Sequence, residues 1–186
     1  MHYDYDTCRD VLLRSLTEAL EQQADRIREL EARTRADGRA LNGMSFDVLP
    51  WHPTITVSFR SSADSEQFRY EPGDWQGYAL IGPHNAAKPL APAMQIVGAA
   101  YVLAGDEVGQ ESNHLIQLAA ADAILDPKVA QLLQECGVRA SIITDSIPYG
   151  LFEFVVVDED RVFRANYCEI VVAMRVARRL LGRAIP

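Results

Sequence analysis

The last forty residues constrain the fold more than any other part of this chain. Residues 147–186 read IPYGLFEFVVVDEDRVFRANYCEIVVAMRVARRLLGRAIP. The run at 151–157 is rich in β-branched and aromatic residues, which is typical of a strand buried on both faces. Asp158-Glu159-Asp160 is a polar break that suits a turn, and Val162-Phe163 then resumes apolar character. The segment therefore predicts a strand, a turn and a short return strand.

A helix is expected after the return strand. Asn166 suits the N-cap position, and Glu169 at N3 can reach back to it. Apolar residues then recur at helical spacing, namely Tyr167, Ile170, Val171, Met174, Ala177 and Leu181. We expect this C-terminal helix to pack on a sheet. We interpret its arginines as a solvated helix end rather than a phosphate contact; they are Arg175, Arg178, Arg179 and Arg183.

Residues 10–35 predict one long helix. Apolar side chains fall on the a and d positions of a heptad, namely Leu13, Leu16, Leu20, Ile27 and Leu30. So narrow a stripe fits either a coiled-coil dimer seam or packing against the rest of the domain. We favour packing, because the stripe ends soon after Leu30. A homodimer joined through this helix is the alternative.

Residues 44–82 are expected to form strands and turns. Residues 54–60, TITVSFR, alternate apolar and polar side chains, which predicts a strand with one face in water. Residues 67–70 are expected to be its hairpin partner. Asp74 could cap a short helix starting at Trp75, whereas residues 78–81 equally fit a strand.

The rest of the chain completes an α+β pattern. Residues 82–92 hold three prolines and are expected to form an irregular loop, residues 93–136 are expected to be helical, and residues 138–144 predict a strand. Strands precede and follow a helical middle instead of alternating with helices. We therefore expect a single domain over 1–186, with a mostly antiparallel sheet, a long N-terminal helix, a helical middle and a C-terminal helix packed on the sheet.

Charge and cysteine content narrow the partners and the compartment. The net charge of −8 argues against nucleic acid or an anionic membrane as the main partner. Residues 106–160 hold eleven acids against Lys128 and Arg139, a net charge of −9, whereas residues 161–186 carry +5. The three cysteines lie far apart and make a poor disulfide framework. With an acidic N-terminus and no apolar run of membrane-spanning length, a cytoplasmic protein is expected.

Catalytic signatures are missing from the sequence. It holds no phosphate-binding glycine loop, no G-x-S-x-G and no C-x-x-C, and its four histidines form no helical i, i+4 pair. We therefore expect no catalytic residue, no metal and no cofactor. The candidate binding residues are aromatic residues beside turns, polar residues of the 82–92 stretch and acids of the negative segment: Trp51, His52, Tyr70, Trp75, His84, Asn85, Asp106, Glu107, Asp158, Glu159 and Asp160.

One segment carries a family resemblance. Residues 68–75, FRYEPGDW, resemble the aromatic-x-x-Pro-x-x-Trp segment of small bacterial α+β immunity proteins of polymorphic toxin systems. The order of a long first helix, a hairpin and this segment is also similar. The resemblance implies a toxin-neutralising role and extends to Tyr70, Pro72 and Trp75. The element order also looks like that of type III secretion chaperones, although this chain is longer and its helical middle is extended.

Three functions follow from the sequence. The leading hypothesis is a non-enzymatic protein-binding module, such as an immunity protein, that uses its acidic surface against a basic partner. The runner-up is an enzyme or small-molecule binder with a pocket under the 82–92 loop, where His84, Asn85 and His114 would supply polar groups. The third is a secretion-chaperone-like dimer joined through the first helix.

Overall fold

The structure, a computed structural model, describes residues 4–49, 52–68, 72–102, 116–139, 153–158 and 161–165. Its helices are α1 (Tyr5–Gln22), α2 (Ala24–Ala36), α3 (Pro83–Val102) and α5 (Pro127–Glu135), and residues 116–124 are also helical. Its strands are β1 (Leu41–Leu49), β2 (Thr54–Ser61), β3 (Gly77–Ile81), β4 (Glu153–Asp158) and β5 (Arg161–Ala165). Two 3₁₀ turns, η1 (Glu66–Phe68) and η2 (Pro72–Asp74), lie between β2 and β3.

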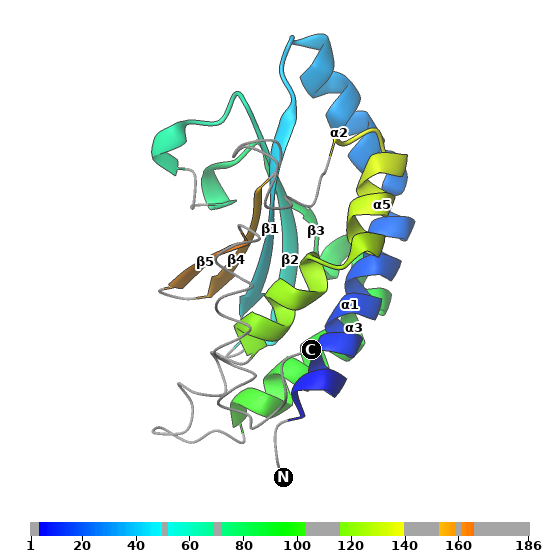
Figure 1. Cartoon of the computed structure of the whole chain (residues 1–186), viewed down its shortest axis with the longest axis vertical. Coiled ribbons are helices and arrows are strands. Elements are labelled where there is room, and N and C mark those ends of the chain that lie inside the picture. Colours follow the sequence, from blue (N-terminus) through cyan, green and yellow to red (C-terminus); the bar gives the residue numbers. More distant parts are fainter. Residues whose placement is uncertain are drawn as a thin grey trace.

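A single mixed sheet joins the described strands. Their order is β3-β2-β1-β4-β5, and every neighbouring pair is antiparallel except β1 with β4, which run parallel. The sequence prediction of an α+β fold with a mostly antiparallel sheet is therefore confirmed. Strands β1 and β4 are neighbours in this sheet, although they come from distant parts of the chain (Figure 1).

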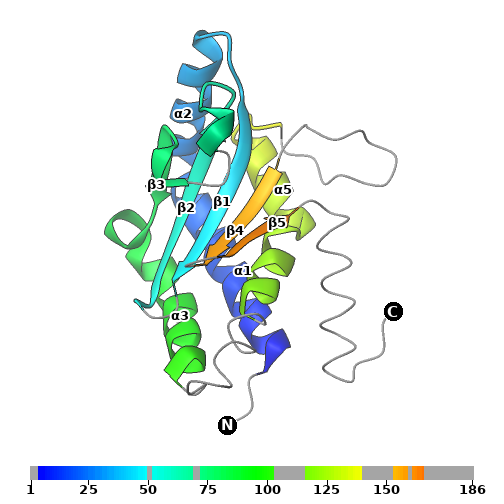
Figure 2. The same ribbon diagram turned by 90° about the vertical axis from the view of Figure 1, so that its left-hand side faces the viewer.

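The described helices gather on one face of this sheet (Figures 1 and 2). Helix α1 contacts both α3 and α5. Alternate residues of β1, among them Phe46, and of β2, among them Phe59, meet this helical layer and are fully buried. The helices supply the opposite half of the core, including Leu12, Leu16, Leu90 and Ile116.

The first helical region differs from its prediction. Instead of one helix over 10–35, the chain forms α1 and α2 with a break at Gln23. Gln23 is the polar exception in the heptad stripe, and its Nε2 donates to the Asn85 carbonyl oxygen at 2.8 Å. This contact ties the break between the two helices to α3. The stripe itself is buried within the chain, since Leu16, Leu20, Ile27 and Leu30 belong to the core, as the favoured alternative predicts.

Strand β2 was expected to have one face in water. Thr54 and Thr56 on that face are half-buried, but the expectation is wrong for the second half of the strand. Ser58 is fully buried and Arg60 is 5% exposed, although both lie on the polar side of the alternation. Ser58 accepts a hydrogen bond from the Ala79 amide. Arg60 pairs with Glu66, although its Nε has no hydrogen-bond partner.

The hairpin partner of β2 is β3 and not residues 67–70. Residues 66–68 form the 3₁₀ turn η1 instead, and η2 follows in place of the helix that Asp74 was expected to cap. The open alternative at 78–81 is settled as a strand, because Val57 pairs with Ile81 and Phe59 with Gly77. Gly77 permits this pairing because a Cβ there would overlap the Phe59 carbonyl oxygen.

The prediction of an irregular loop at 82–92 is also wrong, because helix α3 begins at Pro83. Asn85 stabilises this start: its Oδ1 accepts from the Gly82 amide at 2.8 Å, and its Nδ2 donates to the Leu80 carbonyl oxygen at 3.0 Å. The backbone leaves helical geometry at Ala86 and then resumes it. Pro89 therefore falls in the first turn of the resumed helix, where a missing amide hydrogen costs little. The buried helix expected from residue 94 onward is the continuation of α3.

The C-terminal hairpin is confirmed in its described part. Strand β4 pairs antiparallel with β5, with Asp158 opposite Arg161. The turn residues 159–160 and the predicted helix from residue 166 lie outside the described residues, as does most of the strand predicted at 138–144. Among the helices described, none has the length and apolar character needed to span a membrane.

Candidate functional site

A buried polar cluster lies between β1 and β2, on the side of the strands that alternates with the core. Asp47 stands at its centre and is 8% exposed. The Ser45 hydroxyl donates to its Oδ1, and the Thr56 hydroxyl donates to its Oδ2 at 3.0 Å. Ser58 lies opposite Ser45 in the strand pair, and its side chain also favours the ionised form of Asp47. We call these four residues the Asp47 cluster.

Strand pairing explains why the cluster forms. The antiparallel register places Asp47 opposite Thr56 and Ser45 opposite Ser58. Side chains directly opposite in such a pair lie on the same face within contact distance. The hydroxyls of Thr56 and Ser58 on β2 therefore lie beside Asp47 and Ser45 of β1 once the two strands pair in this register.

Burial sets the proton affinity of the cluster. Desolvation raises the pKa of Asp47 from 3.8 to about 6, against the opposing effect of the Ser45, Thr56 and Ser58 side chains. Desolvation wins because removing a carboxylate from water costs more than these neutral hydroxyl groups return. Asp47 therefore exchanges its proton in mildly acidic solution, where ordinary carboxyl groups are already ionised.

The cluster reaches the edge strand β3 through Ser58. The Ala79 amide donates to Ser58 Oγ at 3.0 Å. Ala79 has a φ of 45°, the left-handed region that a non-glycine residue seldom adopts. Its neighbour Tyr78 is 55% exposed. Ser58 thus ties the backbone beside this surface aromatic residue to β2.

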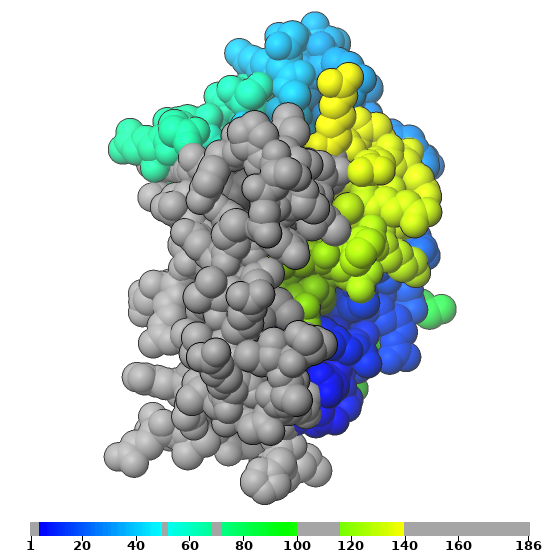
Figure 3. All heavy atoms as spheres, in the orientation of Figure 1, coloured from blue at the N-terminus to red at the C-terminus, as the bar shows by residue number. Residues whose placement is uncertain are grey.

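The connection between β2 and β3 forms an acidic projection beside this edge. Residues 62–76 carry four acids against Arg69, a net charge of −3, and the described part of this connection projects from one side of the molecule (Figures 1 and 3). Asp64 ties its two ends together, because it accepts from the Ser61 amide at 2.6 Å and from the Gln76 amide at 3.0 Å. Glu66 and Asp74 face solvent on its surface.

Arg60 of β2 also holds this connection in place, through an ion pair. Its guanidinium pairs with Glu66, whose side chain is 68% exposed. Arg60 Nε and the nearby Asn42 Oδ1 are buried without a hydrogen-bond partner. The β1 bulge between Leu41 and Gly43 lies opposite Arg60, so both atoms belong to the same irregularity in the β1–β2 ladder.

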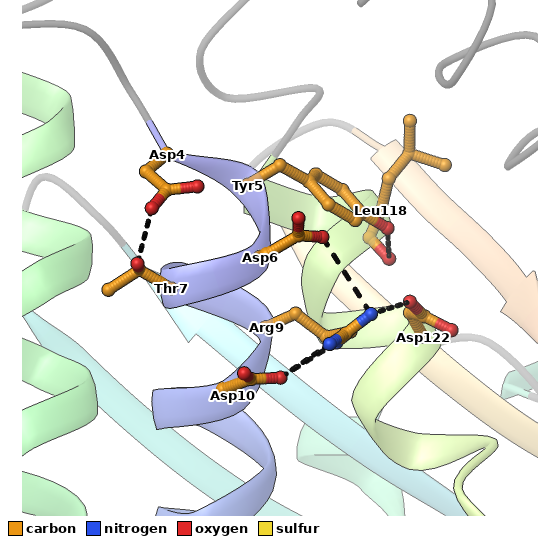
Figure 4. Close-up of polar contacts among 8 residues, drawn as sticks. All are labelled: Asp4, Tyr5, Asp6, Thr7, Arg9, Asp10, Leu118 and Asp122. Atoms are coloured by element: carbon orange, nitrogen blue, oxygen red, sulfur yellow. Dashed lines mark hydrogen bonds and ion pairs between the residues drawn. The ribbon is translucent and has the colours of Figure 1, made fainter. Parts of the chain in front are cut away.

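A second polar cluster joins the start of α1 to the helical residues 116–124 (Figure 4). Arg9 contacts Asp10 at 2.6 Å and lies 3.8 Å from both Asp6 and Asp122. The hydrogen bond to Asp10 raises the pKa of the Arg9 guanidinium, together with the charges of the three aspartates. The buried Tyr5 hydroxyl donates to the Leu118 carbonyl oxygen at 3.3 Å. These contacts fasten two helices together and expose no reactive group.

The candidate residues that the structure describes lie on several separate elements. Trp75 is buried beside η2, whereas His52 is exposed in the β1–β2 turn and His84 is exposed at the start of α3. The backbone of Asp158 is described at the end of β4. Six further candidates lie outside the described residues: Trp51, Tyr70, Asp106, Glu107, Glu159 and Asp160.

The hypothesis of a pocket under residues 82–92 assumed that this stretch is a loop. That stretch is a helix start, and Asn85 uses both side-chain atoms to cap it. His114, the third polar group of that hypothesis, lies outside the described residues. Within the part of the chain that the structure describes, no three His, Cys, Asp or Glu side chains are grouped so as to hold a metal ion.

Sequence reasoning missed Asp47, Ser58 and Tyr78. A signal for the first two was present, because an acid inside an apolar strand and hydroxyls on a neighbouring alternating strand can pair across a sheet. Tyr78 was passed over because the run at 78–81 is too short to separate helix from strand.

Comparison of the chain with known protein families, with curated proteins and with solved structures finds no match. The features of the site itself must therefore carry any functional argument.

Proposed function

We propose that this chain is a non-enzymatic protein-binding module whose partner presents a basic surface. The observation that carries the proposal is the exposure of Tyr78. Among the residues that the structure describes, it is the one large hydrophobic side chain classed as exposed. Tyrosine combines an apolar ring with a hydroxyl, and it is enriched among the residues that dominate protein–protein binding energy.

The position of Tyr78 suits an anchor. It lies on β3, which ends the described strand order, so the ring stands at one edge of the sheet. The strand is held from both sides, since Ser58 accepts from the Ala79 amide and Asn85 donates to the Leu80 carbonyl oxygen. A side chain on a held backbone loses little freedom on binding, which favours affinity.

Charge supports a basic partner. The acidic connection between β2 and β3 carries −3, residues 106–160 carry −9, and the whole chain carries −8. Opposite charge on a partner would speed association and disfavour wrong partners. An immunity protein that neutralises a toxin is the form of this function that the resemblance of residues 68–75 favours. Tyr70 and Trp75 of that segment belong to the same connection.

Affinity capture from native lysate tests the proposal. The immobilised full chain is compared with Tyr78→Ala, with the double variant Glu66→Gln and Asp74→Asn, and with the control Glu18→Gln on α1. We expect a partner that Tyr78→Ala weakens about tenfold or more and that elutes as salt screens the charges. A toxin encoded beside this gene would be the first partner to assay directly.

The control separates a site from a general charge effect. Glu18→Gln removes an exposed acid from a different element and should leave capture unchanged. No captured partner at low or moderate salt, or a partner that all the variants retain equally, would contradict the proposal.

A further inference from the structure

We propose that Asp64 is a positioning residue for partner binding, whose carboxylate clamps together the two arms of the connection between β2 and β3. The first arm is residues 62–68, after β2, and the second arm is residues 72–76, before β3. The inference deepens the proposed binding role and rests on it for its biological consequence. The clamp itself can be tested in the free protein.

The clamp is a single carboxylate shared by two backbone amides. Asp64 Oδ2 accepts from the amide of Ser61, the last residue of β2, at 2.6 Å. Asp64 Oδ1 accepts from the amide of Gln76, the residue before β3, at 3.0 Å. Because each amide uses a different oxygen, both hydrogen bonds form at once, and a carboxylate is a stronger acceptor than a neutral group. One side chain therefore holds the end of β2 beside the start of β3.

Each arm also has local contacts of its own. The Ser62 amide donates to the Ala40 carbonyl oxygen at 2.9 Å, and the Ser62 hydroxyl accepts from the Ala40 amide at 3.2 Å. At the other end, the Tyr78 amide donates to the Trp75 carbonyl oxygen at 3.1 Å. These contacts order the two arms separately, whereas the Asp64 carboxylate joins one arm to the other.

Each proposed binding group lies two residues from a member of the clamp. Glu66 follows Asp64 on the first arm, and its carboxylate pairs with Arg60 of β2. Tyr78 follows Gln76 and lies on β3. A partner that contacts both groups at once needs them at a fixed separation. A clamp that sets this separation before binding reduces the conformational entropy lost in the complex.

The substitution Asp64→Asn isolates the clamp. Asparagine keeps the size of the side chain but offers one acceptor oxygen in place of two, and its NH₂ group would face a backbone amide that is also a donor. One arm must therefore release its hydrogen bond. Because Asp64 is half-buried and lies outside the hydrophobic core, we expect the variant to fold.

Residue-resolved amide hydrogen exchange of the full chain at one pH tests the clamp. The exchange rates of Ser61 and Gln76, corrected for their intrinsic rates, are compared in the wild type, Asp64→Asn and the control Asp74→Asn, which removes an exposed carboxylate from the same connection. We expect protection of at least one of the two amides to fall about tenfold or more in Asp64→Asn and to stay unchanged in the control. Unchanged protection of both amides in Asp64→Asn would overturn the proposal.

Asp64→Glu separates position from charge and keeps the proposal testable if the asparagine variant does not fold. Glutamate retains the charge and both oxygens, but its extra methylene displaces them from the positions that the two amides require. We expect this variant also to lose protection at Ser61 or Gln76. Wild-type protection at both amides and wild-type binding in Asp64→Glu would show that only the charge matters and would overturn the positioning role.

A binding measurement separates this proposal from the proposed function. The partner isolated with the wild-type chain is titrated against Asp64→Asn, Tyr78→Ala, the double variant and the control Glu18→Gln, at a salt concentration that screens exposed charges. We expect Asp64→Asn to weaken binding about fivefold or more and to have a smaller effect once Tyr78 is replaced, since a positioning residue acts through the group that it positions.

The two proposals fail in different ways. Lost protection in Asp64→Asn without any Tyr78-dependent capture would refute the binding role alone. Tyr78-dependent capture that Asp64→Asn leaves unchanged, or that it weakens equally with and without Tyr78, would refute the positioning role of Asp64 alone.

Discussion

At the scale of single residues, the sheet buries two charged side chains that have polar partners within the chain. Asp47 receives hydroxyl hydrogen bonds, and Arg60 pairs with Glu66. A buried charge is normally expensive, and neighbouring donors recover only part of its hydration. The raised pKa of Asp47 reflects the part of its hydration free energy that the neighbouring groups do not recover. The residue therefore limits stability at neutral pH.

The first prediction concerns Asp47→Asn and pH. The folded chain holds the Asp47 proton more tightly than the unfolded chain, because the pKa is about 6 against an ordinary 3.8. The stability that this group contributes is thus complete below about pH 4 and is lost as pH rises through 6. At 1.36 kcal/mol per pKa unit, the loss is about 3 kcal/mol.

Urea denaturation at a series of pH values checks this prediction. The free energy of unfolding of Asp47→Asn, relative to the wild type, should improve by about 3 kcal/mol between pH 4 and pH 8. Asp74→Asn, which removes an exposed carboxylate, serves as the control. A difference between Asp47→Asn and the wild type that stays constant with pH would contradict the raised pKa.

A second prediction at this scale concerns Gly77. A Cβ at this position would overlap the Phe59 carbonyl oxygen, which is backbone and cannot move aside cheaply. Gly77→Ala should lower the free energy of unfolding by about 1–3 kcal/mol, as overpacked sites do. At Gly73 a Cβ would meet nothing within 4 Å, so Gly73→Ala is the matched control. Equal effects of the two changes would show that β3 does not approach β2 this closely.

At the scale of elements, apolar patterning was the reliable signal and irregular composition was not. The stripe of α1 and α2 follows from helical spacing, and the C-terminal hairpin follows from an apolar run interrupted by a polar turn. Residues 82–92 looked like a loop because they hold three prolines. Pro89 falls in a first helical turn once the backbone breaks at Ala86, and no local pattern reports that break.

Helix α1 supplies the prediction at this scale. Leu20 is 1% exposed in the isolated chain, so it belongs to the core of the chain itself. Leu20→Ala should cost about 2–5 kcal/mol in the free energy of unfolding, measured by urea denaturation. Leu13→Ala, at a half-buried position of the same helix, should cost less. If Leu20→Asp gave a folded monomer from a dimer, the helix would be a dimer seam instead.

At the scale of the whole molecule, a few polar contacts connect elements far apart in sequence. Glu31 of α2 is buried, contacts Arg35 at 2.6 Å and accepts from the Leu41 amide at 3.4 Å. Arg35 in turn donates to the Gly137 carbonyl oxygen at 3.1 Å. One carboxylate thus joins α2, the start of β1 and the end of α5. The Arg9 and Tyr5 contacts likewise join the start of α1 to the helical residues 116–124.

The prediction at this scale is a loss of stability in Glu31→Ala. The change leaves Arg35 without its buried partner and the Leu41 amide without this acceptor, so the free energy of unfolding should fall by about 1–3 kcal/mol. Glu29→Ala removes an exposed acid from the same helix and should have little effect. Thermal unfolding of the two variants at one pH decides whether the contact matters.

The sequence by itself determined the α+β class, the mostly antiparallel sheet, the buried stripe of the first helices and the β4–β5 hairpin. The class and the sheet type follow from the order of the predicted elements. The buried stripe follows from helical spacing, and the hairpin follows from an apolar run with a polar break. All of these are read from local patterns. Only the tertiary structure decided the parallel pairing of β1 with β4, the Asp47 cluster and the exposure of Tyr78. These depend on strand register and on which residues meet across the sheet, and contacts between distant segments leave no period in the chain.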